Sequence, residues 1–161
     1  MRKIKAQKIS LENFNNYGSF CDLLNPNGPK MGEGEVLFYR DQLSYFTGGM
    51  MTGFSTVLCQ KRPMIIDEAE RHMDAVEALI PLNDDIVIFA ARAGDDNFPI
   101  DEVEAFIVPK GYIVTFKAGV WHKAQFPLTQ DKVSVACILP ERTYARDCLV
   151  VKLDEPIAIE I

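Results

Sequence analysis

Short apolar runs recur along the chain between residues that favour turns. They are rich in Val, Ile, Phe and Tyr and too short for ordinary helices, so they predict β-strands. Helical signals are few: Ser10 is a candidate N-cap for a helix to Asn16, and Asp101 for one turn to Ala105. We therefore expect an all-β fold with short peripheral helices and strands at residues 36–39, 54–59, 78–82, 86–91, 106–108, 112–116, 133–139 and 149–153.

Two of these runs, residues 86–91 and 133–139, are almost continuously apolar. A strand with one face in water alternates between apolar and polar residues, so these two strands are expected to be covered on both faces. The pattern fits two packed sheets with a further layer outside them. We expect that layer to be a second subunit, which predicts a homodimer.

Residues 25–35 interrupt this pattern with prolines and glycines, and we expect a loop there. No internal repeat or linker divides the chain. A length of 161 residues is close to that of one domain, so we expect a single domain over residues 1–161.

Composition narrows the range of functions. Hydrophobic residues make up 48% and charged residues 25%, as in ordinary globular proteins, and the net charge of −6 argues against a nucleic-acid partner. The longest purely apolar stretch, residues 86–91, is far shorter than a membrane span, and the basic start leads into no apolar signal region. We expect a cytoplasmic protein without membrane contact, whose four cysteines, in no Cys-x-x-Cys pair, stay reduced.

Candidate chemistry centres on the only two histidines, His72 and His122. If the segment around Glu70 is extended, Glu70 and His72 share a face, and Glu77 lies at the start of the next strand. Gly119 allows a sharp bend that would aim His122 inward. Two imidazoles and one or two carboxylates on converging strands suit a divalent metal such as Zn, Mn, Fe or Ni.

The spacing of these residues resembles the two cupin motifs. Glu70-x-His72-x4-Glu77 is similar to the first motif, H-x-H-x(3,4)-E, and Gly111-x5-Lys117-x-Gly119-x2-His122 to the second, G-x5-P-x-G-x2-H. Three shorter motifs narrow the resemblance to one family. The order Glu70-Arg71-His72, Ala78-Leu79-Ile80-Pro81 and Val120-Trp121-His122 resembles the ureidoglycolate lyase (ureidoglycolate hydrolase) family, with E-R-H, A-F-I-P and V-W-H.

This resemblance implies a cupin-type β-barrel, a double-stranded β-helix that is usually dimeric. It also implies an enzyme that splits ureidoglycolate, a small hydroxy acid, into glyoxylate and urea during allantoin breakdown. The chain departs from the family pattern at three places. Glu77 stands where the family commonly has Gln, Met73 where it usually has Pro, and Lys123-Ala124 where a second His and a Pro often follow.

The hypothesis assigns a role to each candidate. His72, Glu77 and His122 would hold the metal, which would lower the pKa of the substrate hydroxyl. Whichever of Glu70 and Glu77 does not bind metal would move the proton, so both are candidate catalytic residues. Lys117 is two residues from Gly119 and would share its face in an extended strand. It is therefore expected to face the cavity and pair with the substrate carboxylate.

Other interpretations stay open at this stage. One cupin pocket supports many reactions, so a metal-dependent isomerase or epimerase of a sugar or oxo-acid is an alternative. A non-catalytic module that binds a small ligand is another. Glu70 is also compatible with a surface ion pair to Arg71 or Arg62, Lys123 with solvent, and Trp121 with core packing.

Overall fold

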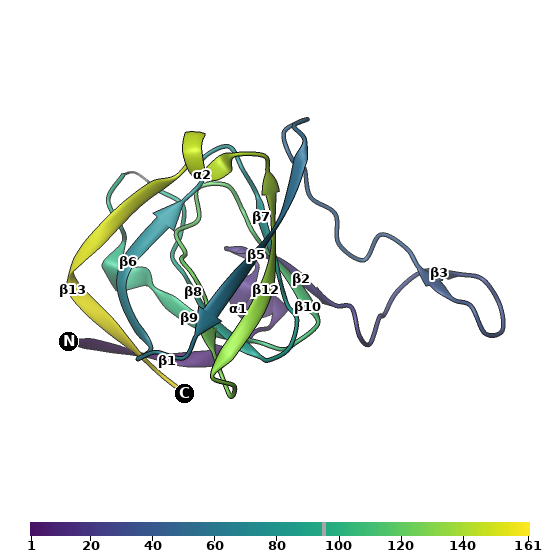
Figure 1. The fold of residues 1–161 in the computed structure, drawn as a ribbon, viewed down its shortest axis with the longest axis horizontal. Coiled ribbons are helices and arrows are strands. Elements are labelled where there is room, and N and C mark those ends of the chain that lie inside the picture. Colours follow the sequence, from purple (N-terminus) through teal and green to yellow (C-terminus); the bar gives the residue numbers. More distant parts are fainter. Residues whose placement is uncertain (95) are drawn as a thin grey trace.

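The computed structural model describes residues 1–94 and 96–161, whose strands form two large facing sheets and a small hairpin (Figure 1). The six-stranded sheet has the order β11-β8-β9-β1-β13-β6 and the five-stranded sheet the order β2-β10-β7-β12-β5. The strands are β1 (Arg2–Lys8), β2 (Gly18–Asp22), β3 (Lys30–Met31), β4 (Phe38–Tyr39), β5 (Thr52–Gln60), β6 (Ile65–Arg71), β7 (Glu77–Pro81), β8 (Ile86–Ala90), β9 (Glu104–Val108), β10 (Tyr112–Phe116), β11 (Phe126–Pro127), β12 (Lys132–Pro140) and β13 (Leu149–Glu160).

The prediction of a mostly β chain is confirmed, and each of the eight expected strands overlaps an observed one. The pattern missed the two-residue strands β3 and β11. It also missed β1, β2 and β6, whose charged or small residues interrupt the apolar runs. Among the described strands no backbone ladder joins the two large sheets, so they pack against each other without closing by hydrogen bonds.

The core lies on both sides of β8. Ile86, Ile88 and Ala90 pack between the two sheets with Phe106 and Phe116. The alternate residues of β8 face a second cluster, to which β1, β6 and β13 contribute and which contains Phe89, Trp121, Ile66 and Ile157. The continuous apolar run is thus explained, but the outer layer over β8 comes from this same chain. This strand therefore gives no support to a second subunit.

The short helices lie at the periphery. α1 (Leu11–Phe14) has Ser10 as its N-cap as expected, with a capping box in which Ser10 and Asn13 exchange hydrogen bonds, but it ends two residues before the expected Asn16. The turn expected after Asp101 is wrong in position: the 3-10 helix η1 (Ile100–Glu102) includes Asp101, and β9 begins at Glu104. α2 (Thr143–Arg146) joins β12 to β13.

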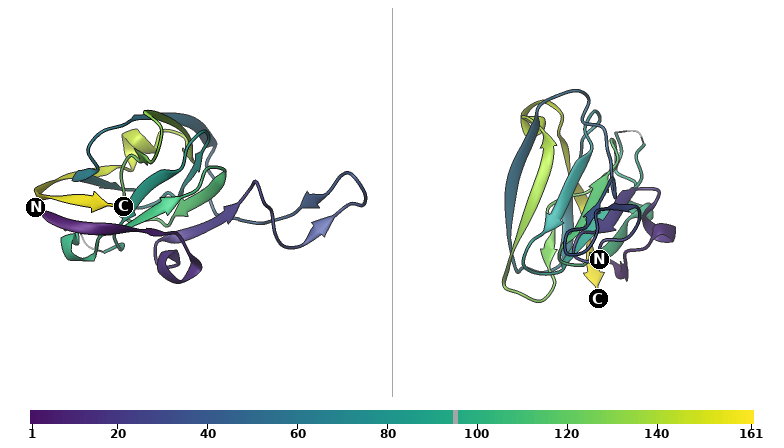
Figure 2. Two further views of the ribbon diagram at one scale, coloured as in Figure 1. Left: turned by 90° about the horizontal axis from the view of Figure 1, so that it is seen from below. Right: turned by 90° about the vertical axis from the view of Figure 1, so that its right-hand side faces the viewer.

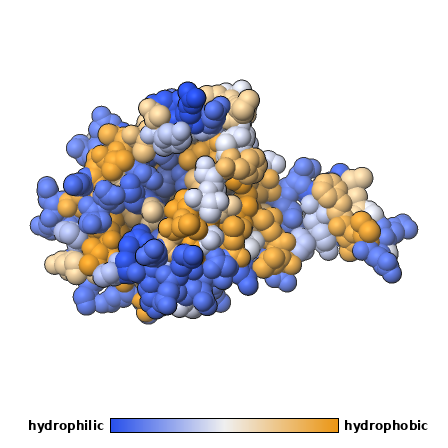
Figure 3. All heavy atoms as spheres, viewed as in Figure 1, coloured by the Kyte–Doolittle hydropathy of each residue, from blue (hydrophilic) through white to orange (hydrophobic). Residues whose placement is uncertain are grey.

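An arm formed by residues 23–51 projects from the sheets between β2 and β5 (Figures 1 and 2). The expected loop at residues 25–35 is in part a hairpin, because Lys30 and Met31 of β3 pair with Tyr39 and Phe38 of β4. Apolar atoms, drawn in orange, gather on the arm and near the centre of the view, where β5 and β12 lie side by side (Figure 3).

The structure bears on two expectations from composition. In the part of the chain that it describes, no helix is long and apolar enough to span a membrane. The four cysteines form no disulfide: Cys59 and Cys137 are buried, and Cys21 and Cys148 are half-buried.

Candidate functional site

The turn between β6 and β7 brings Glu70, His72 and Glu77 to one place. Glu70 and His72 share a face of the extended chain as expected, and Arg71 points the other way. The Arg71 guanidinium lies 4.6 Å from the centre of the Trp121 ring and pairs with Asp96. Both Arg71 and Trp121 are therefore part of the packing behind the site.

His122 is held against the end of β6 by backbone hydrogen bonds. Its N–H donates to the Glu70 carbonyl at 2.8 Å, and the Glu70 N–H donates to the His122 carbonyl at 2.7 Å. Gly119 makes the bend that leads here, with a φ of +80° and an N–H bonded to the His72 carbonyl. A side chain at this position would be strained, and its Cβ would lie 3.0 Å from the Ala93 Cβ. The inward aim predicted for His122 is confirmed.

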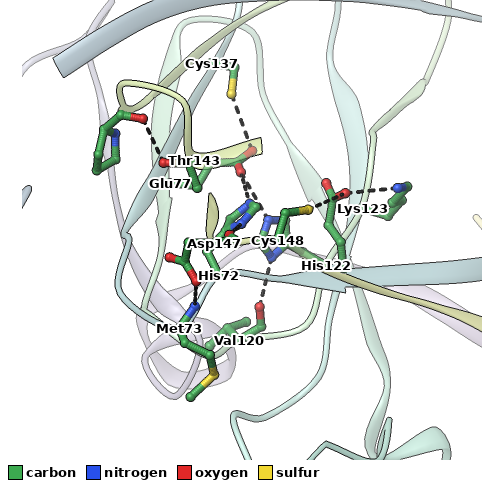
Figure 4. Close-up of polar contacts among 12 residues, drawn as sticks. His72, Met73, Glu77, Val120, His122, Lys123, Cys137, Thr143, Asp147 and Cys148 are labelled. Carbon is green, nitrogen blue, oxygen red and sulfur yellow. Dashed lines mark hydrogen bonds and ion pairs between the residues drawn. The ribbon is translucent and has the colours of Figure 1, made fainter. Parts of the chain in front are cut away.

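Glu77 lies between the two imidazoles (Figure 4). Its Oε2 is 3.1 Å from Nε2 of His72 and 3.2 Å from Nε2 of His122, and its Oε1 is 3.6 Å from Sγ of Cys137. All four side chains are buried. The three residues expected to hold a metal are therefore in contact with one another.

The pKa values at this centre follow from burial and charge. Burial alone would raise the pKa of Glu77, but the charge of His122 and the hydrogen bonds from both imidazoles outweigh it and lower that pKa strongly. Burial would lower the pKa of His72, but the hydrogen bonds to Glu77 and to the Asp147 carbonyl outweigh it and raise that pKa. Burial and the Glu77 charge raise the pKa of the Cys137 thiol. Glu77 is thus an ionised carboxylate and Cys137 a neutral thiol.

The outer nitrogens of both imidazoles bond to main-chain carbonyl oxygens. Nδ1 of His72 lies 2.6 Å from the Asp147 oxygen, and Nδ1 of His122 lies 2.9 Å from the Val120 oxygen. The His122 ring also stacks on Phe116, with ring centres 4.4 Å apart. These contacts fix both rings so that Nδ1 donates and Nε2 points at Glu77, the usual arrangement of metal-binding histidines.

The donor atoms also have spacings that suit a metal ion. Ligand atoms about 2.0–2.1 Å from one ion, at angles of about 90–110°, lie about 2.8–3.4 Å apart. The two Nε2–Oε2 distances of 3.1 and 3.2 Å fall in this range. Glu70 is a further candidate donor, because Glu70, His72 and His122 each offer a ligand atom within 4.8 Å of the others. The residues therefore form a His/Glu cluster that could hold a divalent cation.

A charged group adjoins the cluster at Glu70. The Lys123 Nζ is 2.9 Å from Oε2 of Glu70 and 3.3 Å from Oε1 of Glu68, and Sγ of Cys148 is 3.7 Å from Oε2 of Glu70. Burial would lower the pKa of Lys123, but the two carboxylates outweigh it and raise that pKa. Lys123, expected to be solvated, is thus a half-buried cation that holds Glu70.

Lys117 is not brought into the cluster. Its side chain is exposed, and its Nζ donates to the Asn15 carbonyl at 2.5 Å. The parity argument fails because β10 ends at Phe116 and a turn with positive φ at Gly119 follows. The expectation that Lys117 faces the cavity is therefore wrong.

Sequence reasoning missed three residues that contact the cluster: Cys137, Asp147 and Lys123. Cys137 had a weak signal, since alternation along β12 places it on the same face as the core residues Val133 and Val135. Asp147 contacts His72 although the two are 75 positions apart in sequence, and no local sequence pattern predicts such a contact.

Solved structures of known proteins share this fold. A dTDP sugar isomerase from Desulfovibrio desulfuricans G20 superposes with a TM-score of 0.52 over 85% of each chain, at 14% sequence identity. At this identity the likeness supports the fold alone. With the two facing sheets, it confirms a cupin-type fold.

Sequence relatives point to one family. Ureidoglycolate lyases from Escherichia coli K12 and Salmonella newport are 31% and 30% identical to this chain over 64 residues. Each alignment spans 40% of this chain and 40% of the relative. The model of the ureidoglycolate lyase family matches residues 1–160, and the chain therefore belongs to the ureidoglycolate lyase family.

Proposed function

We propose that this protein is a ureidoglycolate lyase, which releases urea and glyoxylate from ureidoglycolate. The observation that carries the proposal is the Glu77 oxygen shared by two buried imidazoles, in a chain that belongs to this family. We propose further that residues 1–161 act as one cupin-like domain, in a cytoplasmic homodimer that serves allantoin breakdown.

His72, Glu77 and His122 are the proposed metal ligands. The fixed tautomers and the donor spacing support this choice, and the depressed pKa of Glu77 keeps its carboxylate ionised. Zn, Mn, Fe and Ni all accept two imidazoles and a carboxylate. When bound, such an ion would lower the pKa of the substrate hydroxyl and hold its oxygen.

Glu70 is the proposed general base. It lies beside His122, is only half-buried, and is held by Lys123. In the proposed reaction Glu70 takes the hydroxyl proton of ureidoglycolate. The carbon–nitrogen bond then breaks as the carbonyl of glyoxylate forms, and Glu70 returns the proton to the departing urea nitrogen. Atoms and charge balance without another reactant.

A surface depression of about 350 Å³ lies beside the strand that carries Cys137. It is lined by Gly53 and Ser55 of β5, by the end of β12 and by α2, and none of the proposed site residues lines it.

The test is an assay of urea and glyoxylate release by the purified protein, together with measurement of its metal content. We expect equal amounts of the two products, and at least a hundredfold lower rate with loss of metal for His122→Ala. Metal-loaded wild-type protein that releases no urea would overturn the lyase proposal and favour the isomerase or epimerase alternative. Protein with neither metal nor turnover would favour a ligand-binding module.

A further inference from the structure

A small cavity adjoins Lys123, the residue that holds Glu70. Its volume is about 120 Å³, and it is lined by residues 65–68 of β6, by residues 123, 124 and 126, and by Arg62 and Phe89. The lining includes none of the three proposed metal ligands. Lys123 bonds to Glu70 and therefore connects the cavity to the His/Glu cluster.

The cavity lies where the backbone pairing of β6 with the segment after His122 stops. Glu70 and His122 exchange two backbone hydrogen bonds, and this bridge is isolated. A continued antiparallel ladder would pair Glu68 with Ala124, because two steps along one strand match two steps along the other. Among the described residues no such ladder forms, and β6 is the last strand of its sheet. The edge of β6 is therefore open at Glu68, and this opening is the cavity.

Lys123 and Glu68 are the polar groups on the two sides of this opening. The Lys123 Nζ is 2.9 Å from Oε2 of Glu70 and 3.3 Å from Oε1 of Glu68. An ammonium group has three N–H donors, so one is left for a ligand. The Glu68 side chain is 39% exposed, and its carboxylate can accept further hydrogen bonds. A ligand that bonds to both residues must offer an acceptor to Lys123 and a donor to Glu68.

Arg62 forms a wall of the cavity and has partners of its own. Its NH1 and NH2 groups donate to the carbonyl oxygens of Gln125 at 3.1 Å and Ala124 at 3.2 Å, and its guanidinium lies 4.2 Å from the centre of the Phe126 ring. The charges around the cavity balance, with two cations and two carboxylates: Arg62, Lys123, Asp67 and Glu68. An entering carboxylate would find both cations paired and would be repelled by the acidic side chains. A neutral polar group therefore fits the cavity better than an anion.

The size of the cavity selects a small ligand group. One water molecule in the liquid occupies about 30 Å³, so 120 Å³ has room for about four atoms of that size. Buried Ile66 and Phe89 contribute an apolar part of the lining, against which a flat group can lie. A ureido group, N–CO–N, has this size, is flat and neutral, and carries both a carbonyl acceptor and N–H donors.

We propose that this cavity is the subsite for the ureido group of the substrate, with Glu68 and Lys123 as its specificity-determining residues. The proposal rests on the proposed lyase function, because it takes ureidoglycolate as the substrate. In it, the Lys123 ammonium donates a hydrogen bond to the urea carbonyl oxygen, and the Glu68 carboxylate accepts one from the terminal N–H group.

Glu70 relates this subsite to the reaction. It offers a ligand atom within 4.8 Å of those of His72 and His122, and its carboxylate also bonds to Lys123 (Figure 4). In the proposed reaction Glu70 returns its proton to the departing urea nitrogen, so that nitrogen lies beside Glu70. The rest of the ureido group is attached to this nitrogen and extends from Glu70 toward Lys123 and the cavity.

The test compares two small acids by calorimetric titration into the purified protein. Ureidoacetate carries the ureido group but lacks the hydroxyl, so it cannot react. Glycolate carries the hydroxyl and the carboxylate but lacks the ureido group. We expect Glu68→Ala to bind ureidoacetate at least tenfold more weakly than wild type, as for the loss of a hydrogen bond to a charged group, and to bind glycolate within twofold. A general loss of structure would weaken both.

A second variant fills the cavity without removing a charge. Ala124→Leu adds a larger side chain to the wall and is expected to show the same selective loss of ureidoacetate binding. Glu155→Ala is the control, because it removes an exposed carboxylate from β13, the neighbour of β6 in the sheet, and should bind both acids as wild type does. Circular dichroism and thermal melting check that each variant is folded.

Turnover separates this proposal from the lyase proposal. With ureidoglycolate, Glu68→Ala is expected to raise KM at least tenfold and to keep kcat within about threefold, since the ureido contact is made before the reaction begins. Wild-type protein that binds ureidoacetate through Glu68 but releases no urea from ureidoglycolate would refute the lyase proposal and leave a ureido-binding site.

The opposite results would overturn the subsite alone. They are urea release by wild-type protein combined with unchanged ureidoacetate binding in Glu68→Ala and Ala124→Leu, or with an equal loss of ureidoacetate and glycolate binding in both variants. A loss of glycolate binding only would also overturn it, because the cavity would then hold the carboxylate end of the substrate. Wild-type protein that neither binds ureidoacetate nor releases urea would overturn both proposals.

Discussion

The Nδ1 atom of His72 lies 2.6 Å from the main-chain carbonyl oxygen of Asp147. The Asp147 carboxylate in turn accepts hydrogen bonds from the N–H groups of Met73 at 2.7 Å and Asp74 at 2.9 Å. Asp147, which lies just before β13, therefore fixes both the tautomer of His72 and the turn that follows His72. Asp147 is a positioning residue, because it acts on the site through His72.

Asp147→Ala is expected to lower stability and turnover together. It removes two charge-assisted hydrogen bonds, each worth about 1.5–3 kcal/mol, and frees the carbonyl that orients His72. We expect a loss of about 3 kcal/mol by chemical denaturation and a kcat at least tenfold lower, with partial rescue by Asp147→Asn. Asp74→Ala, at an exposed neighbouring carboxylate, is the control. Equal behaviour of Asp147→Ala and Asp74→Ala would contradict this role.

Glu77→Gln tests the charge at the centre of the cluster. An amide oxygen can still bind a metal, but it lacks the negative charge that two imidazoles now stabilise. We expect zinc affinity to fall at least tenfold by calorimetric titration, with kcat within about tenfold of wild type at saturating metal. Cys137→Ala, which removes the contact to the other Glu77 oxygen, should keep wild-type zinc affinity. Unchanged zinc affinity in Glu77→Gln would exclude Glu77 as a ligand.

Lys117→Met and Lys123→Met form a matched pair close in sequence. Lys123 holds the carboxylate of Glu70, whereas Lys117 is exposed and bonds to the Asn15 carbonyl. We expect Lys123→Met to lower kcat/KM for ureidoglycolate at least tenfold and Lys117→Met to stay within twofold. A larger loss of kcat/KM in Lys117→Met than in Lys123→Met would contradict this and support the role in substrate binding that the sequence predicts for Lys117.

The sequence was sufficient for the parts of the site that depend on alternation. Glu70 and His72 are two apart on an extended strand, and a positive-φ glycine before His122 supplies the bend, so these positions follow from local rules. Alternation ceases where a strand ends, and for this reason Lys117, one residue after β10, was misplaced.

Contacts between residues far apart in sequence could not be predicted from local patterns. The contact of Cys137 with Glu77 depends on the register between β12 and β7, which no local pattern specifies. The strand β1 was missed because Arg2, Lys3 and Lys5 mask its alternation with Ile4 and Ala6. Its pairing with β9 and β13 gives the strand its stability, and that pairing is a property of the whole fold.

Gly119→Ala should disturb His122 without altering any functional group. Its φ of +80° disfavours a side chain, and the added Cβ would lie 3.0 Å from the Ala93 Cβ. Strain of this kind amounts to about 1–3 kcal/mol. We expect a loss of stability of that size in urea denaturation and a fall in kcat. Gly34→Ala is the control: its φ is +67°, but it lies in the arm, with no atom within 4 Å of the added Cβ. Full activity of a destabilised Gly119→Ala would show that the bend does not position His122.

Asp84 makes the stability of the fold depend on pH at a place remote from the histidines. Its buried carboxylate accepts hydrogen bonds from the N–H groups of Thr129 and Gln130 at 2.9 and 2.8 Å and from the Thr129 hydroxyl at 2.6 Å. Burial would raise the pKa of Asp84, but these hydrogen bonds outweigh it and lower that pKa.

A lowered pKa means that Asp84 stabilises the fold fully above its ordinary pKa of about 3.9 and loses this contribution as pH falls through the lowered value. Asp84→Asn is therefore expected to be about 2 kcal/mol less stable than wild type at pH 7, with a difference that shrinks below about pH 4. Urea denaturation at a series of pH values measures this difference. Asp67→Asn, at an exposed carboxylate of β6, should show almost none. A deficit for Asp84→Asn that stays constant down to pH 2 would mean that the packing of Asp84, and not its charge, stabilises the fold.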